Sequence, residues 1–205
     1  MSSAPQLGRP GMHTITVVEN VSLDGVAQAP ASPEEDRRGG FEHGGWAFQH
    51  LASDPEAMER AMSGEPAAAM LLGHRTYDQL VGHWLSTPDD NPFTELLRTT
   101  PKHVATRDAT VDLPHPNSHR LVGEATQTVA ALKEHGEGEL VVLGSLALVR
   151  DLTAAGLVDR FVLTTIPVVL GSGARLFEGS HVTLEVEQTW ASERGAVVAT
   201  YRVAR

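Results

Sequence analysis

Three short motifs combine glycine, hydroxyl and arginine side chains, and each lies at the end of a predicted strand. They are Gly73-His74-Arg75-Thr76, Thr106-Arg107 and Gly144-Ser145. Glycine lets a ligand approach the backbone closely, and N–H groups at the start of a helix attract anions. Arginine adds strong hydrogen bonds to phosphate oxygens. The motifs favour a phosphate or pyrophosphate site; the alternative for each motif alone is a tight turn, a surface charge or a capped helix.

Two further turns carry charged side chains. Ser22-Leu23-Asp24-Gly25 follows the first predicted strand, and Arg175 lies in the glycine-rich turn at 171–175. Asp24 is either a turn-forming residue or a carboxylate presented at the end of a central strand, where α/β sheets place ligands. Arg175 either binds a substrate phosphate or pairs with an acidic neighbour.

The segment 27–40 holds two prolines, two terminal glycines and a cluster of mixed charges. Such a segment cannot pack into a core, so we expect a mobile loop that is able to close over a ligand. Phe41, Trp46 and Phe48 follow it closely. We expect two of these rings in the core, although they could also form a wall for a planar ligand.

Alternation of short apolar runs with amphipathic segments predicts an α/β fold with a mostly parallel sheet and helices on both faces. Strands are predicted at 13–20, 67–72, 102–106, 120–122, 140–143 and 161–170. Helices are predicted from 46 to about 51, from 54, from 74 to 84, from 92, at 125–135 and from 146 to Gly156. The alternating segment 182–203 predicts an antiparallel hairpin that closes one edge of the sheet.

Composition narrows the possible functions. The 205 residues suit one domain, over 12–205, preceded by a disordered tail at 1–11. A net charge of −10 argues against nucleic acid as a partner. The chain has no cysteine, and its ten histidines are scattered, so we expect no metal and a cytoplasmic protein. No apolar run approaches the roughly 18 residues of a membrane span, and no signal peptide is visible.

The order of these motifs resembles the dihydrofolate-reductase-like superfamily, in the branch of the reductase domain of bifunctional riboflavin-biosynthesis deaminase-reductases. The resemblance covers about 12–204. It is carried by SLDG at 22–25, LGHRTYD at 72–78, KHVATR at 102–107, LVVLGS at 140–145, GLVDRFVLTTIPVVLGSGARLF at 156–177 and ATYR at 199–202.

The resemblance implies a three-layer fold that binds NADPH. It places Gly73, Arg75 and Thr76 at the cofactor phosphates, and Thr106 and Arg107 at the adenosine 2′-phosphate. Leu143, Gly144, Ser145 and Leu146 match the turn that cradles the pyrophosphate or the nicotinamide side. Many relatives have two adjacent glycines in that turn, whereas this chain has Gly144-Ser145.

The expected reaction is hydride transfer from NADPH to a small heterocyclic or sugar-derived substrate, similar to that of 5-amino-6-(5-phosphoribosylamino)uracil reductase. We expect the nicotinamide near 22–25 and Gly144. Asp24 would orient the substrate or relay a proton, and Ser22, Trp46 and Arg175 would contact the substrate. Relatives suggest a homodimer.

Three alternatives stay open. Dihydrofolate reduction is in doubt because the acid that holds the pteridine in true dihydrofolate reductases has no clear counterpart; the nearby Glu42 precedes the helix. The chain could instead be a regulatory protein that binds NADPH without turnover. It could also be an interaction domain whose glycine turns are purely structural.

Overall fold

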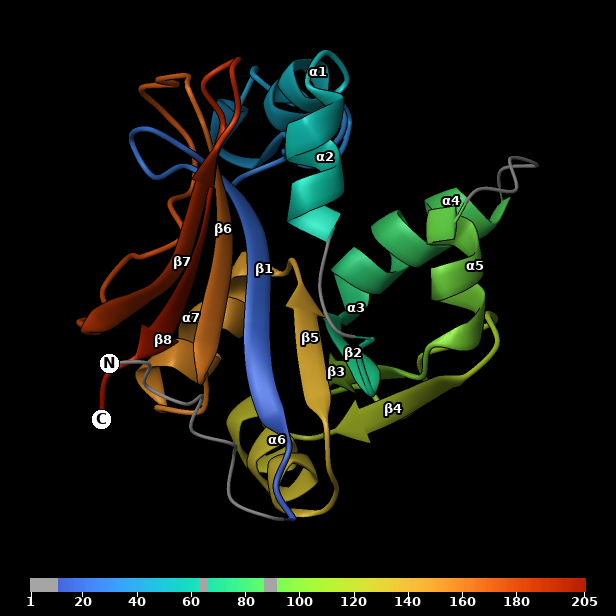
Figure 1. Ribbon diagram of the computed structural model, residues 1–205. Helices are drawn as coiled ribbons and strands as arrows, with labels where there is room; N and C mark the ends of the chain where they lie inside the picture. Colours follow the sequence, from blue (N-terminus) through green and yellow to red (C-terminus); the bar gives the residue numbers. More distant parts are fainter. Residues whose placement is uncertain (1–10, 63–65, 87–91) are drawn as a thin grey trace.

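The computed structural model describes residues 11–62, 66–86 and 92–205, and these build one eight-stranded sheet flanked by helices (Figure 1). The strand order is β4-β3-β2-β5-β1-β6-β8-β7. The strands are β1 (Thr14–Ser22), β2 (Ala69–Gly73), β3 (Lys102–Thr106), β4 (Ser118–Val122), β5 (Glu139–Leu143), β6 (Arg160–Ile166), β7 (Leu184–Ala191) and β8 (Val197–Val203). The pairs from β4 across to β6 are parallel, and β8 and β7 complete the sheet as an antiparallel hairpin.

The helices connect these strands as crossovers. They are η1 (Arg38–Gly40), α1 (Trp46–Leu51), α2 (Pro55–Met62), α3 (His74–Thr76), η2 (Tyr77–Gly82), α4 (His83–Ser86), α5 (Pro92–Thr99), α6 (Ala125–Glu134) and α7 (Leu146–Ala154). α3, η2 and α4 are consecutive, and η2 is a π-helical stretch. None of the helices in the described ranges is long and apolar enough to cross a membrane.

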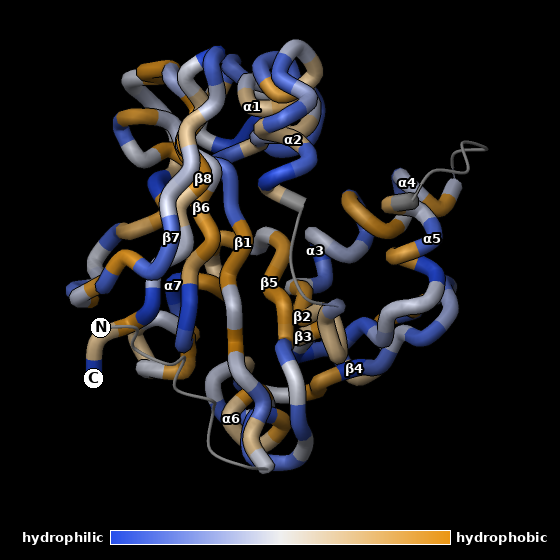
Figure 2. Tube along the Cα trace, viewed as in Figure 1, coloured by the Kyte–Doolittle hydropathy of each residue, from blue (hydrophilic) through white to orange (hydrophobic). Residues whose placement is uncertain are grey.

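Both faces of the sheet are covered, because neighbouring residues on a strand point to opposite sides. On β2, Leu71 packs with α6 and α7, whereas Leu72 packs with η2 and α5. β2 and β5 are accordingly apolar along most of their length (Figure 2). A third cluster joins Trp46 and Leu51 of α1 to Ile166 of β6. The predicted helices on both faces are confirmed.

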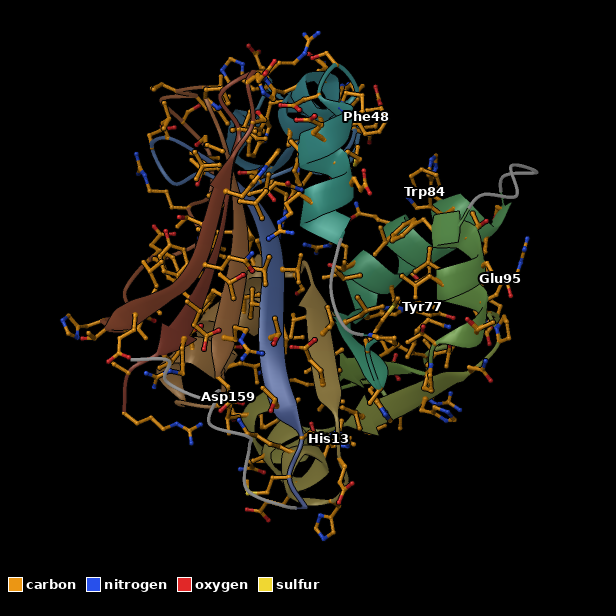
Figure 3. All side chains as sticks on the ribbon, viewed as in Figure 1. His13, Phe48, Tyr77, Trp84, Glu95 and Asp159 are labelled. Carbon is orange, nitrogen blue, oxygen red and sulfur yellow. The ribbon has the colours of Figure 1, made fainter. Side chains whose placement is uncertain are left out.

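Tyr77 helps to fill the face of the sheet that η2 and α5 cover. The side chain is fully buried in the cluster with Met70 and Leu72, and its hydroxyl accepts a hydrogen bond of 3.1 Å from the backbone N–H of His115. Trp84 and Phe93 meet edge to face nearby, between α4 and α5. Figure 3 shows Tyr77 and Trp84 in this layer, on the opposite side of the molecule from Asp159.

The structure differs from the sequence prediction mainly at β6. This strand ends at Ile166, whereas the apolar run predicted a strand as far as Leu170. Pro167 follows, and proline has no N–H to continue the hydrogen-bond ladder. Val169, beyond the end of the strand, is 68% exposed. Residues 1–10 of the predicted tail at 1–11 lie outside the described residues, as does the predicted loop at 87–91.

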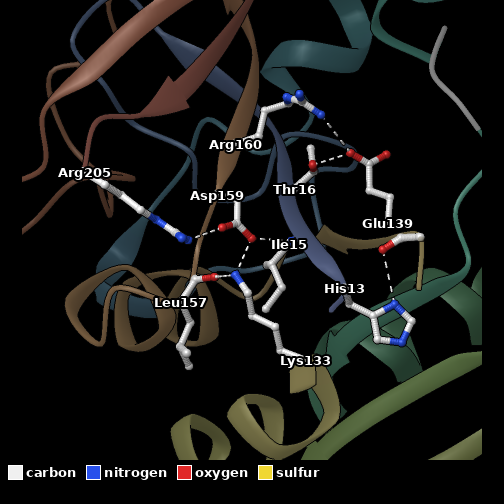
Figure 4. A network of polar contacts seen from close by, with 10 residues as sticks. His13, Ile15, Thr16, Lys133, Glu139, Leu157, Asp159, Arg160 and Arg205 are labelled. Carbon is white, nitrogen blue, oxygen red and sulfur yellow. Dashed lines mark hydrogen bonds and ion pairs between the residues drawn. The ribbon is translucent and has the colours of Figure 1, made fainter. Parts of the chain in front are cut away.

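A network of ionic hydrogen bonds holds the amino-terminal end of β1 (Figure 4). The Asp159 carboxylate accepts a bond of 2.8 Å from the N–H of Ile15 and also binds Lys133 and Arg205. The Lys133 side chain is only 8% exposed, and its ammonium also donates to the Leu157 carbonyl at 2.7 Å. A buried ammonium without its carboxylate is strongly unfavourable, so Asp159 anchors this end of the sheet.

Asp159→Ala is expected to lower the free energy of unfolding by about 3 kcal/mol, because it leaves the Lys133 ammonium buried without a counter-charge. Arg205→Ala is the matched control; it removes an exposed partner of the same carboxylate and should cost less than about 1 kcal/mol. Urea denaturation measures both. Equal losses in the two variants would contradict this account of the network.

Candidate active site

The carboxyl ends of β1, β5 and β2 meet at one edge of the sheet, and the predicted motifs follow two of them. Leu71 pairs with Val142, and Val18 pairs with Leu143. Gly73 of β2 therefore lies level with Gly144, and Glu19 of β1 lies beside Gly144 on its other flank. Parallel pairing thus brings residues from three distant parts of the chain to one place.

The turn after β5 has an unusual backbone. Gly144 and Ser145 both have positive φ angles, of 72° and 66°, and Ser145 immediately precedes α7. Positive φ is uncommon for serine and often marks a functional turn. A Cβ on Gly73 would lie 2.5 Å from the Ser145 hydroxyl oxygen, and one on Gly144 would lie 3.2 Å from the Thr76 methyl group. The two glycines allow the turn and α3 to pack against each other.

A hollow of about 120 Å³ opens at this edge. It is lined by Glu19 of β1, by Ala27, Gln28, Ala29, Pro30, Glu35, Asp36 and Arg38 of the following loop, by Arg75, Thr76 and Gln79 after β2, and by Gly144, Ser145, Leu146 and Ala147 after β5. Ligand clefts commonly measure about 300–1,000 Å³, and an engineered cavity of roughly 150 Å³ holds benzene. The hollow is therefore smaller than a typical ligand cleft.

The loop at 27–40 forms one wall of this hollow and is fastened through the buried Gln28. The Gln28 amide donates to the carbonyls of Asp36 and Arg38, at 3.1 and 3.0 Å, and its oxygen accepts from the N–H of Ala174 at 2.8 Å. Across the hollow, the Gln79 amide binds the carbonyl of Glu35. The loop therefore lies over the strand ends, as a lid would.

Glu19 is the least expected member of the site. It is 7% exposed, lies on a central strand, and its Oε1 atom has no hydrogen-bond partner among the described residues. Burial raises the pKa of Glu19 from 4.5 to about 8, with the charge of Glu35 adding to the rise and the backbone N–H of Gly144 opposing it. In most molecules, the Glu19 carboxyl group therefore carries its proton at neutral pH.

Positive charge in the hollow comes from Arg38 and Arg75. Arg38 binds the Asp36 carboxylate, with one contact of 2.7 Å from its Nε, and this bond is the main reason that the pKa of Asp36 is lowered. The charge of Arg75, at the start of the helical segment after β2, contributes to the same lowering. Two guanidinium groups thus lie near the strand ends despite the acidic composition of the chain.

Asp24 lies in a different environment from the one expected of a proton relay. Its carboxylate accepts hydrogen bonds from the Ser22 hydroxyl at 2.7 Å and from the N–H groups of Leu170 and Gly171 at 3.1 and 2.9 Å. These bonds, the one from Ser22 foremost, lower the pKa of Asp24 to about 2. Asp24 is thus ionised at neutral pH and holds its turn together, and neither it nor Ser22 lines the hollow.

The remaining predicted residues occupy neighbouring positions. Thr106 and Arg107 lie at the end of β3, next to β2, but Arg107 is 79% exposed and forms a bidentate ion pair with Glu124 at 2.9 Å. Trp46 is buried in the core, where its indole N–H donates to the Gln28 carbonyl at 2.8 Å. Arg175 is exposed and donates to the Asp24 carbonyl at 2.9 Å. Neither Trp46 nor Arg175 lines the hollow.

Comparison with known proteins gives a consistent result. The family model of the RibD C-terminal domain matches residues 13–199. The chain belongs to this family. A search of curated proteins found no match.

Solved structures show the same fold at low sequence identity. A putative riboflavin biosynthesis protein from Shewanella sp. PV-4 has a TM-score of 0.63 and 22% identity, over 95% of this chain and 100% of that one. Dihydrofolate reductase from Enterococcus faecalis, complexed with NADP(H) and RAB-propyl, has a TM-score of 0.58 and 15% identity, over 94% and 97%.

A third structure is larger than this chain. It is the diaminohydroxyphosphoribosylaminopyrimidine deaminase/5-amino-6-(5-phosphoribosylamino)uracil reductase of Thermotoga maritima, with a TM-score of 0.58 and 12% identity, over 94% of this chain and 57% of that one. This RibD-type chain therefore has a dihydrofolate-reductase-like α/β fold, with a mostly parallel sheet and an antiparallel C-terminal hairpin, as the sequence predicted.

The raised pKa of Glu19 predicts a pH dependence of stability. Between about pH 4.5 and pH 8, the folded state holds a proton on Glu19 that the unfolded chain has lost. The contribution of Glu19 to stability is therefore fully present below pH 4.5 and is lost as the pH rises through 8. Glu19→Gln removes the titration. Between pH 5.5 and pH 8, the free energy of unfolding of the wild type should fall by about 3 kcal/mol relative to that of Glu19→Gln, because each pKa unit is worth about 1.36 kcal/mol.

Urea denaturation of both proteins at several pH values measures this difference, in which the ionisations common to both proteins cancel. A difference between the two that stays constant with pH would show that Glu19 has an ordinary pKa.

Gly73→Ala tests the contact between β2 and the Ser145 turn. The new Cβ would lie 2.5 Å from the serine hydroxyl oxygen, so we expect a loss of about 1–3 kcal/mol of stability from overpacking. Gly82→Ala is the control, because its nearest neighbour would be His115 Nε2 at 3.9 Å. Adding Ser145→Gly to Gly73→Ala should restore stability; thermal unfolding that shows no rescue would refute this contact.

Proposed function

We propose that the chain is an NADPH-dependent reductase acting on a small heterocyclic or sugar-derived substrate. The observation that carries this proposal is the convergence of Arg75, the Gly144-Ser145 turn and Glu19 on one hollow at the carboxyl edge of a parallel sheet. Membership of the RibD C-terminal family supports it, because a 5-amino-6-(5-phosphoribosylamino)uracil reductase is among the proteins with this fold.

The residues at this edge fit a phosphorylated dinucleotide. Gly144 leaves room that a Cβ would fill, and the backbone N–H groups at the start of the nine-residue helix α7 favour an anion. Arg75 adds a guanidinium suited to phosphate. We assign the pyrophosphate to these groups and the 2′-phosphate to Thr106 and Arg107, where Arg107 would exchange its exposed partner Glu124 for the phosphate.

The cofactor would supply the hydride, and the chain would supply binding, orientation and exclusion of water. The hollow is smaller than a typical ligand cleft, so the loop at 27–40 must move when a dinucleotide and a substrate enter. The Gln79 contact to Glu35 is then a bond that opens and closes with the loop. Closure of such a loop keeps water from the reacting groups.

The family and the site support a proposal for the substrate class. The reductase of Thermotoga maritima is named for 5-amino-6-(5-phosphoribosylamino)uracil, and we propose a substrate of that general kind. Dihydrofolate is less favoured, because Glu42 is exposed and lies outside the hollow lining. The acid that faces the hollow is instead Glu19, on a strand.

Titration with NADPH and NADH, followed by nicotinamide fluorescence, tests the proposal. The wild type should prefer NADPH. Arg107→Ala should weaken NADPH by about 1.5–3 kcal/mol and leave NADH unchanged, because only NADPH carries the 2′-phosphate. Arg75→Ala should weaken both dinucleotides by a similar amount.

Arg205→Ala is the control for a general loss of positive charge, since this residue lies at the opposite end of β1. A wild-type protein that binds neither dinucleotide would refute the proposed function. Equal affinities for NADPH and NADH would refute the role of Arg107.

A further inference from the structure

Glu19 is a buried acid whose carboxyl group the fold uses only in part, through the backbone N–H of Gly144. Its Oε1 atom has no partner among the described residues, whereas buried carboxyl groups with a structural role are normally bonded, as Asp54 is to Ser192 at 2.5 Å. Glu19 lines the hollow beside Gly144. Gly144 belongs to the turn that we assign to the cofactor. A buried, unpartnered carboxyl oxygen on a residue that lines the hollow points to a contact with a ligand.

The charged groups around Glu19 favour its neutral form, and this balance depends on the charge beside it. The charged groups that line the same hollow are Glu35, Asp36 and Arg38 from the loop and Arg75 from α3. Asp36 is paired with Arg38, which leaves Glu35 as the carboxylate that acts on Glu19 and opposes its ionisation. A positive charge that appears beside Glu19 would reverse this balance and favour the carboxylate.

We propose that Glu19 is the proton donor of the reduction, a neutral acid that gives up its proton as the adjacent cofactor ring becomes cationic. This assignment rests on the proposed function. The ring is uncharged in NADPH and positively charged in NADP⁺, so ionisation of Glu19 keeps the total charge of the buried site constant. The energy of a charged site in a medium of low dielectric depends steeply on that total.

The reaction balances with no other reagent. The hydride is added to the carbon of a C=N or C=O bond, and the π electrons of that bond take the proton of Glu19 on nitrogen or oxygen. Glu19 is left as a carboxylate beside the oxidised cofactor and regains a proton from water when the products leave. The substrate class is therefore a compound with a reducible imine or carbonyl group, since an isolated C=C bond offers no heteroatom to accept the proton.

Proton release on nucleotide binding tests the assignment without any substrate. Calorimetric titrations at pH 7 in two buffers of different ionisation enthalpy give the number of protons released. For the wild type we expect close to one more proton released with NADP⁺ than with NADPH; the phosphates are common to both nucleotides and cancel. Glu19→Gln should abolish this difference and weaken NADP⁺ roughly tenfold at pH 8.5, while NADPH affinity changes less than threefold.

Glu139→Gln is the matched control, because Glu139 lies at the opposite end of β5 against Thr16 and Arg160; it should behave as the wild type. Glu35→Gln removes the carboxylate that acts on Glu19, and the difference between the two nucleotides should persist in this variant. The assignment is overturned if the wild type shows no difference between the nucleotides, or if the difference survives in Glu19→Gln. If neither nucleotide binds the wild type, the proposed function fails and the role of Glu19 fails with it.

Discussion

Parallel alignment of β1, β5 and β2 is the constraint on which the site depends. Because all three strands run in the same direction, the residues that follow them meet at one edge, although they are separated by more than fifty positions in the chain. The edge closes tightly only because Gly73 has no side chain to collide with Ser145. Ser145 of this contact immediately precedes α7.

The site combines two features that work against stability. Ser145 holds a backbone conformation that serine seldom adopts, and Glu19 keeps an acid away from water with one oxygen unbonded. Departures of this kind are expected at functional sites, where surrounding structure offsets their cost. Here the buried core on both faces of the sheet and the Asp159–Lys133 network at the far end of β1 provide that support.

Local patterns in the sequence predicted most of the elements, and long-range contacts explain the rest. β3 was predicted at its observed bounds, Lys102 to Thr106. β6 was predicted too long, because its apolar run continues past Pro167. Glu19 was not identified, since an acid within a strand gives no sign of burial until α7 and Gly144 are placed beside it. Gln28 was missed for the same reason: its amide bonds to Ala174, far along the chain.

A crystal structure of the protein with NADPH would test the central claim most directly. The account predicts the pyrophosphate at the N–H groups at the start of α7 and near Arg75, with the nicotinamide ring against Glu19 beneath the 27–40 loop. A dinucleotide bound on another face of the sheet, or a ring that leaves Glu19 without contact, would contradict it.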